Sequence, residues 1–311
     1  MTRFHRAVIA VLALALTTAA CGSAEEKDAS TLQDRIKVSG DFGEKPILEI
    51  DPPLKLTEST SWSEEIGTGD KIGSDATAIL QLTLADGRTG KTALSTFDEG
   101  QRALEVKLGE QVFPSLVQAL GGKPATSRVV VASTSEDAYG EKGAPQIGIK
   151  GGDPVVMVAD IISTDPTSVL AKPTGATRAA PAKAPVLEEK DGLPVGFDFA
   201  KARKTKKLTV IPLREGTGPV VEEPDRIAAN YLGQVWGAKQ PFAETFSNEP
   251  ALFTIGLQGV IKAWDSALAG QKEGARVMII APPAAAYGAT AQQNIPANST
   301  LVFVVDVLGV G

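Results

Sequence analysis

Side chains able to do acid–base or nucleophilic chemistry are scarce in this chain. His5 is the only histidine and Cys21 the only cysteine among 311 residues. Because His5 lies in a segment expected to be removed, no Ser-His-Asp triad, Cys-His pair or histidine-ligated zinc site can be assembled. No glycine-rich phosphate-binding pattern opens a helix after a strand, and no paired-carboxylate motif stands out. An enzyme built from this chain must therefore work largely by shape and by dipoles.

Apolar residues in the C-terminal part of the chain follow the periods of strands and of one short helix. Residues 258–268 are the helix candidate, because Val260, Ile261 and Trp264 share one face that Leu268 continues. Apolar runs predict strands at 208–213, 226–236, 251–256, 275–281 and 300–308. An antiparallel sheet wrapped over this helix is an α+β arrangement.

The order of aromatic residues on these elements resembles the FKBP-type peptidyl-prolyl cis/trans isomerases over residues 205–311. The resemblance implies the same α+β fold and a pocket for the proline ring of a polypeptide substrate. It implies that Trp264 forms the floor of this pocket and that Tyr231, Phe242 and Phe303 form its walls. Val260 and Ile261 would line one side, with the Ile261 N–H donating to the substrate. The Tyr287 hydroxyl would bind a substrate carbonyl, and Ile295 would lie in a loop that covers the pocket.

Such a pocket would act on the rotation of an X-Pro bond, which amide resonance opposes with a barrier of ~18–20 kcal/mol. The twisted transition state has a smaller amide dipole than the planar ground state. A dry aromatic pocket therefore binds the twisted form better, without proton transfer. The alternative for each of these side chains, Trp264 above all, is a purely structural place in the core.

Several departures from the family pattern fall in or beside the expected pocket. Ala243 stands where the family usually has an aspartate, and Asn248 replaces the arginine that often accompanies it. Ala251 stands where another pocket aromatic is common, and the covering loop at 292–294 is short. We expect weaker isomerisation or an altered ligand preference, with Glu244 as a partial substitute for the missing carboxylate.

Two blocks of the chain repeat one another at a spacing of roughly 150 residues, which is typical of tandem domains. The paired positions are Leu82 with Tyr231, Leu116 with Trp264, Tyr139 with Tyr287 and Met157 with Phe303. Only Tyr139 keeps the type of its counterpart. We therefore expect two FKBP-like domains, of which the first has lost isomerase function.

The N-terminal residues have the composition of an export signal. Arg3 and Arg6 precede an apolar run that is too short to span a membrane. Cys21 follows two alanines and resembles a bacterial lipobox, which implies acylation and attachment to a membrane surface. Simple secretion with a chance cysteine is the alternative.

Removal of the signal takes Arg3 and Arg6 with it and lowers the count of basic residues from 31 to 29. With 37 acidic residues, the mature chain has a net charge of −8, which argues against a nucleic-acid partner.

The expected organisation is a signal peptide at 1–21, a flexible tether at 22–34, a degenerate FKBP-like domain at 35–162, a Pro/Ala-rich linker at 163–191 and an isomerase domain at 192–311. The predicted protein is lipid-anchored on the extracytoplasmic face of the cell membrane and accelerates X-Pro rotation in exported proteins. A non-catalytic protein that binds a proline-containing segment is the alternative, and a structural envelope protein is the third possibility. No metal or organic cofactor is implied.

Overall fold

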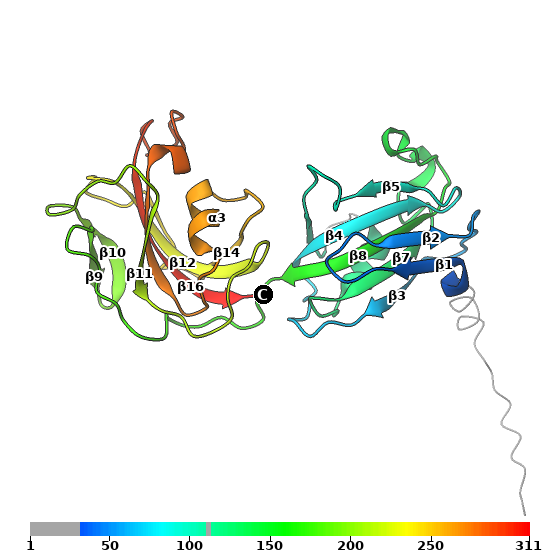
Figure 1. The fold of residues 1–311 in the computed structure, drawn as a ribbon, viewed down its shortest axis with the longest axis horizontal. Helices are drawn as coiled ribbons and strands as arrows, with labels where there is room; N and C mark the ends of the chain where they lie inside the picture. Colours follow the sequence, from blue (N-terminus) through cyan, green and yellow to red (C-terminus); the bar gives the residue numbers. More distant parts are fainter. Residues whose placement is uncertain (1–31, 110–112) are drawn as a thin grey trace, which may run out of the picture.

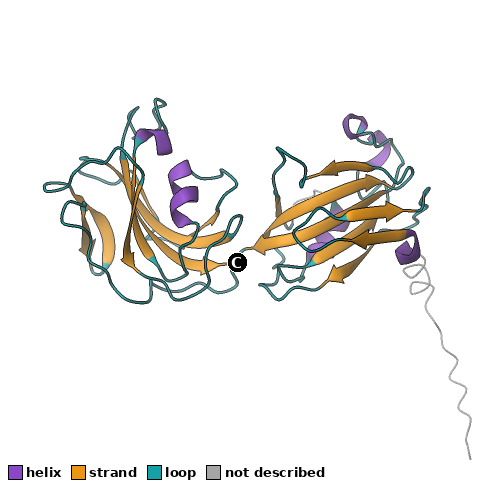
Figure 2. Ribbon diagram, viewed as in Figure 1, coloured by secondary structure: helices purple, strands orange, loops and turns teal. Residues whose placement is uncertain are grey.

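The computed structural model describes residues 32–109 and 113–311 and contains two antiparallel six-stranded sheets, each with a short α-helix packed on it (Figures 1 and 2). We call β1 to β8 (Ile36–Thr164) the first domain and β9 to β16 (Val186–Val310) the second domain. The α+β fold predicted from the sequence is confirmed. Within the described residues, no helix is both long enough and apolar enough to cross a membrane.

The sheet of the second domain has the strand order β11-β15-β16-β12-β13, with β14 also paired to β12. Its strands are β11 (Thr209–Arg214), β12 (Arg226–Val235), β13 (Ala243–Glu244), β14 (Ala251–Thr254), β15 (Arg276–Ala281) and β16 (Leu301–Val310). Helix α3 (Lys262–Leu268) covers one face of this sheet. Its buried Trp264 and Leu268 pack against β15 and β16, as the predicted apolar helix face requires.

The sheet of the first domain has the matching order β3-β7-β8-β4-β5, with β6 also paired to β4. Its strands are β3 (Thr60–Glu65), β4 (Thr77–Asp86), β5 (Thr92–Ser95), β6 (Leu104–Lys107), β7 (Arg128–Ser133) and β8 (Val155–Thr164). Helix α2 (Pro114–Leu120) takes the place of α3. The repeat seen in the sequence is therefore a repeat of topology, strand for strand.

Each domain also has a two-stranded hairpin that the sequence analysis did not predict. These hairpins are β1 (Ile36–Ser39) with β2 (Ile47–Ile50), and β9 (Val186–Lys190) with β10 (Leu193–Asp198). Each packs on the sheet face opposite the helix and closes a second hydrophobic cluster. Because both faces of each sheet are covered, the long central strands are apolar along nearly their whole length.

An arginine–aspartate pair with a buried aspartate fixes each hairpin, at equivalent positions of the two domains. In the first domain, Arg128 binds Asp160 through two hydrogen bonds of 2.6 and 2.8 Å and donates to three carbonyls of the β1–β2 turn. In the second, Arg276 binds Asp306 at the same two distances, and its third nitrogen reaches Glu189 of β9. Such bidentate pairs are the strong form of charge-assisted hydrogen bond.

Parts of the predicted linker and of the predicted tether contact the two domains in the described structure. Strand β8 runs on to Thr164 and β9 already begins at Val186, so both ends of the predicted linker belong to sheets. Between them the chain follows the second domain, where the N–H of Leu170 donates to Leu308 at 2.7 Å. Of the predicted tether, Leu32 packs against the first domain, whereas residues 22–31 lie outside the described residues.

The two domains meet at Arg226, the first residue of β12. Its guanidinium donates to Asp165, just beyond β8, at 2.5 Å and to Glu105 of β6 at 2.6 Å. The Arg226 side chain is only 8% exposed. The hydroxyl of Ser163 adds a 3.0 Å hydrogen bond to the carbonyl of Pro224. The first domain is thus joined to the end of the strand whose other half carries the candidate site.

Candidate functional site

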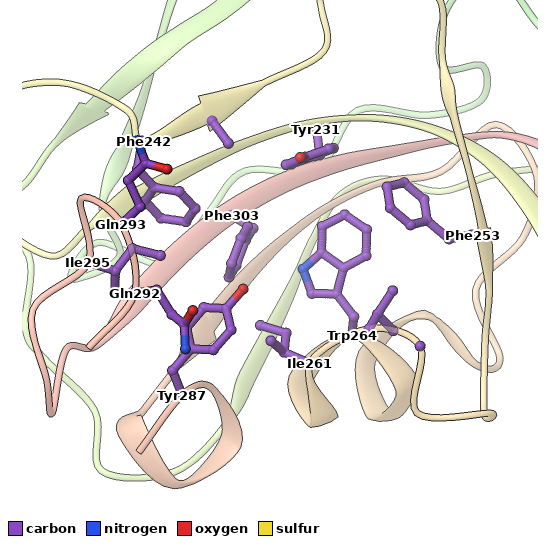
Figure 3. Close-up of a pocket in the computed structure, with 13 residues that line it drawn as sticks. Tyr231, Phe242, Phe253, Ile261, Trp264, Tyr287, Gln292, Gln293, Ile295 and Phe303 are labelled. Atoms are coloured by element: carbon purple, nitrogen blue, oxygen red, sulfur yellow. The ribbon is translucent and has the colours of Figure 1, made fainter. Parts of the chain in front are cut away.

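A cavity of about 600 Å³ opens between α3, strands β12 and β16 and the segment after β15 (Figure 3). All eight site residues predicted from the sequence line it: Tyr231, Phe242, Val260, Ile261, Trp264, Tyr287, Ile295 and Phe303. Five further residues complete the lining: Ala243, Phe253, Gly259, Gln292 and Gln293. None of these side chains carries a charge at neutral pH. The cavity is therefore suited to an uncharged ligand.

The indole of Trp264 forms the floor of this cavity, with 4% of the residue exposed. Tyr231, Phe253 and Phe303 surround it with ring centroids 5.1, 4.9 and 5.7 Å away and interplanar angles of 84°, 70° and 86°. Phe242 continues the wall, 5.8 Å from Phe303. Edge-to-face contacts of this kind are the favoured packing of aromatic rings. They give the cavity rigid apolar walls.

The indole N–H of Trp264 is the one buried side-chain donor or acceptor without a hydrogen-bond partner in the described part of the chain. An unsatisfied buried donor costs roughly 1–3 kcal/mol, so such groups are rare unless they serve a purpose. Figure 3 shows the indole nitrogen on the side of the ring that faces Phe303 and Tyr287. This orientation favours a ligand floor over a purely structural tryptophan.

Two further donors lie at the rim of the cavity. The Tyr287 hydroxyl points toward its centre in Figure 3, and the residue is 39% exposed. The N–H of Ile261 donates to no described residue, whereas its carbonyl accepts from the N–H of Trp264 at 2.8 Å. Both groups are free to bind carbonyl oxygens of a polypeptide.

The segment before α3 is held in place by a glycine and a carboxylate. Gly256 has a φ of 91°, and a Cβ at this position would lie 2.7 Å from the Glu223 side chain. A larger residue is therefore excluded on two grounds. The Gly256 N–H donates to Asp265 of the helix at 2.7 Å. This bond closes the segment on the helix and fixes Val260 and Ile261 at the cavity wall.

Gly233 of β12 is a site determinant that the sequence analysis missed. A Cβ at this position would lie 2.6 Å from Phe242 and 2.8 Å from Phe303. The absence of a side chain on the strand therefore gives both rings their room. A sign of this role was present in the sequence. Gly233 follows Tyr231 by two positions, so a large side chain and a glycine are neighbours on the same face of the strand.

The suggestion that Glu244 replaces the missing carboxylate is wrong in this structure. Ala243 lines the cavity, but Glu244 is exposed and accepts hydrogen bonds from the N–H and hydroxyl of Ser247 at 3.1 and 2.6 Å. Successive residues of β13 point to opposite sides, so the two cannot both face the cavity. Asn248 is exposed as well and donates to Ser247.

No carboxylate accepts a hydrogen bond from the Tyr231 hydroxyl, which makes no hydrogen bond to a described residue. Burial raises the pKa of Tyr231 above its ordinary value, and the nearby Tyr287 and Glu244 act in the same direction. The phenol therefore stays protonated throughout the neutral range and remains available as a donor.

The corresponding region of the first domain is filled by its own side chains. Leu82, Leu84 and Met157 are at most 1% exposed, and Leu84 takes the place of Gly233 in the matching strand register. Phe113 at the start of α2 packs edge-on against Tyr139, with centroids 5.2 Å apart. Leu82, Leu84 and Met157 therefore form a packed core in the first domain at the place where the second domain has its aromatic cavity.

The second domain is thus a six-stranded sheet around a short helix, with an aromatic cavity floored by the helix tryptophan. Residues 218–308 match the family model described as FKBP-type peptidyl-prolyl cis-trans isomerase. This segment is therefore similar to FKBP-type domains, and the first domain shares its topology.

Several curated proteins resemble the chain. The FKBP-type peptidyl-prolyl cis-trans isomerase FkpA of Escherichia coli strain K12 is 34% identical over 116 residues, which are 36% of this chain and 42% of that protein. FK506-binding protein 4 of Chaetomium thermophilum is 36% identical over 101 residues, 32% of this chain and 21% of that protein. The chain matches between 21% and 53% of the length of such relatives. A crystal structure of FkpA from Escherichia coli aligns over 35% of this chain and 50% of its own, with 32% identity and a TM-score of 0.32.

Proposed function

We propose that this protein is a peptidyl-prolyl cis/trans isomerase whose activity resides in the second domain. The observation that carries the proposal is the uncharged aromatic cavity floored by Trp264, in the segment that matches the FKBP-type isomerase family. The substrates are proline-containing polypeptides, with the proline ring on the indole. Tyr231, Phe242 and Phe303 enclose this ring, and Val260 and Ile295 close the sides.

Catalysis in this proposal is differential binding of the twisted amide. The planar X-Pro amide is strongly hydrated, whereas the twisted form loses resonance and part of its dipole. Transfer into a cavity without charges therefore costs the twisted form less. The Ile261 N–H and the Tyr287 hydroxyl hold the carbonyls on the two sides of the proline. A protease-coupled assay with a proline tetrapeptide and the full chain tests this directly.

One observation favours a second candidate function, binding without catalysis. Ala243 leaves the Tyr231 hydroxyl without a carboxylate partner, so one polar contact of the family's pocket is missing. The two functions separate in one pair of measurements. Calorimetric binding of a proline peptide without any acceleration in the coupled assay supports the binding protein, whereas binding with acceleration supports the isomerase.

The missing carboxylate gives a test of how far Ala243 limits the rate. Ala243→Asp is expected to raise kcat/KM several-fold, because a charge-assisted hydrogen bond to Tyr231 would orient the phenol. The wild-type rate should be flat between about pH 5 and 9, since tyrosine titrates near 10 and burial raises the Tyr231 pKa further. The variant should gain an acid limb as its carboxylate protonates.

Thermal unfolding must accompany these kinetics, because a carboxylate buried without a cation can destabilise the domain. Asn248→Arg is the companion change that would supply a neutralising charge. A stable double variant with wild-type kinetics at every pH would show that the polar network is irrelevant here.

The first domain is proposed to be non-catalytic, because its counterpart of the cavity is packed with leucine and methionine. Tyr287→Phe removes the hydroxyl that is proposed to bind a substrate carbonyl. Because one hydrogen bond contributes about 0.5–1.5 kcal/mol, this change should lower kcat/KM by about three- to tenfold. Tyr139→Phe is the matched change in the first domain and should leave kcat/KM unchanged. Equal losses from both variants in the full chain would contradict the assignment of activity to the second domain.

Location at the extracytoplasmic face of the cell membrane is likewise proposed, from the signal-like N-terminus and Cys21, which lie outside the described residues. A cysteine carrying several acyl chains would hold the protein firmly on the bilayer. Metabolic labelling with a palmitate analogue should tag the wild-type protein and leave Cys21→Ser unlabelled. Release of both forms into the medium in equal amounts would overturn the anchor.

A further inference from the structure

A second contact between the two domains reaches the segment that carries one wall of the cavity. Arg102, in the loop between β5 and β6, donates a hydrogen bond to the side-chain oxygen of Gln258 at 2.9 Å. Gln258 lies between β14 and α3, immediately before Gly259, which lines the cavity. Val260 and Ile261 follow in the same lining. The first domain therefore contacts the chain directly beside the N–H that is proposed to bind the substrate.

The same stretch of the first domain also holds the start of this segment. Glu105 of β6 accepts a hydrogen bond from Arg226 at 2.6 Å, and the same guanidinium nitrogen donates to the Thr254 hydroxyl at 2.9 Å. Thr254 is the last residue of β14 and leads into the segment 255–261. Arg102 and Glu105 thus act on the middle and on the start of one segment of the second domain.

The middle of this segment has few other contacts that would hold its shape. Residues 257–260 make no backbone hydrogen bond to a described residue, and the bond from Arg102 is their one side-chain hydrogen bond within the described ranges. Gln258 is exposed and has a φ of 61°, in the left-handed region that residues with a Cβ seldom adopt. Gly259 is exposed as well, and a Cβ on it would meet no atom within 4 Å. The Arg102 contact therefore restrains a stretch that is otherwise free to move.

The loop that carries Arg102 is itself fixed to the first domain. The N–H of Thr96 donates to the Leu82 carbonyl of β4 at 2.8 Å. Farther along the loop, the N–H of Gln101 donates to the Asp98 carbonyl at 3.0 Å and closes a turn. Arg102 thus extends from a restrained backbone.

We propose that the first domain positions a wall of the substrate cavity, with Arg102 and Gln258 as the positioning residues. A wall that is already ordered costs a bound polypeptide less conformational entropy than a wall that must be ordered on binding. This gain applies equally to the ground state and to the transition state, so it lowers KM and leaves kcat unchanged. The inference rests on the proposed function and gives the domain without the aromatic cavity a part in it.

A double-mutant cycle in the full chain tests the pair. Arg102→Ala is expected to raise KM for a proline tetrapeptide about three- to fivefold, within the range for loss of one hydrogen bond, with kcat unchanged. Gln258→Ala should give the same rise. The double variant should rise no further, because the two side chains act as one pair. Gln101→Ala is the matched control on the same exposed loop and should keep the wild-type KM.

Gln258→Glu is a further variant of nearly unchanged shape that turns the hydrogen bond into an ion pair. Its KM should be no higher than that of the wild type at low ionic strength and should rise with added salt. This salt dependence should be absent when Arg102→Ala is combined with Gln258→Glu. An unchanged KM in Arg102→Ala, or effects of the single alanine changes that multiply in the double variant, would overturn the positioning role.

Motion of the wall gives a readout that does not depend on catalysis. The NMR order parameters of the backbone at residues 257–261 should fall from about 0.85 toward about 0.6 in Arg102→Ala and stay high in Gln101→Ala. This fall, with weaker calorimetric binding of a proline peptide but no isomerisation by the wild type, supports the positioning role and rejects the isomerase. Isomerisation with unchanged order parameters and unchanged KM supports the isomerase and rejects the positioning role. If no peptide is bound or isomerised and the order parameters stay the same, both are rejected.

Discussion

Replacing Trp264 by leucine is expected to lower kcat/KM for an X-Pro peptide by at least about tenfold, which corresponds to ~1.4 kcal/mol of transition-state stabilisation. The indole is the floor of the cavity and its N–H is unpaired, so the variant loses both the flat apolar surface and a donor. The fold should survive, because the first domain has Leu116 at the matching position of α2. Loss of packing should cost about 2–4 kcal/mol in the free energy of unfolding.

Leu116→Ala in the first domain is the matched control for the loss of packing. It should destabilise the protein by a similar amount, about 2–5 kcal/mol, and leave the activity of the folded protein unchanged. Urea unfolding gives the stability of each variant, and the coupled assay gives its rate per folded molecule. Full specific activity of Trp264→Leu in a strongly destabilised protein would make Trp264 a core residue and refute the site.

The fold class and the main site residues could be predicted from sequence because both depend on local spacing. Runs of branched apolar residues predict the strands, and the spacing of Trp264 and Leu268 predicts α3. The predicted start of this helix at residue 258 is wrong, because Ile261 is extended and the helix begins at Lys262. The eight site residues were then assigned through the resemblance of the order of residues along the chain to the FKBP-type isomerases. The structure brings all eight to one cavity.

The sequence analysis missed features that depend on contacts between residues far apart in the chain. The β9–β10 hairpin is held to the sheet by Glu189 and Arg276, 87 residues apart, and no local pattern announces such a pair. Glu244 was assigned to the pocket by its position next to Ala243, but the alternation along β13 turns it to solvent. The predicted Pro/Ala-rich linker also donates a hydrogen bond from the N–H of Leu170 to Leu308 of the second domain, through backbone groups that any composition provides.

Gly233 is the clearest case of a residue whose role depends on contacts with distant parts of the chain. A leucine at this position should nearly abolish activity. Its Cβ alone would approach Phe242 and Phe303 to within 2.8 Å, so the larger side chain must displace both rings into the cavity. The matching residue of the first domain is Leu84, fully buried in a strand of the same register, so the sheet itself accommodates leucine. We expect Gly233→Leu to fold with a loss of about 1–3 kcal/mol from overpacking and to lower kcat/KM by about a hundredfold.

Leu84→Ala supplies the control for this last change, because it alters the matching strand position without touching the aromatic cavity. It should cost about 2–5 kcal/mol of stability through the cavity that it creates in the first domain, with kcat/KM unchanged. The binding of a proline peptide, followed by calorimetry, should be lost in Gly233→Leu and kept in Leu84→Ala. If Gly233→Leu keeps wild-type kinetics while it remains folded, Phe242 and Phe303 are not walls of the substrate pocket, and the activity must lie elsewhere in the molecule.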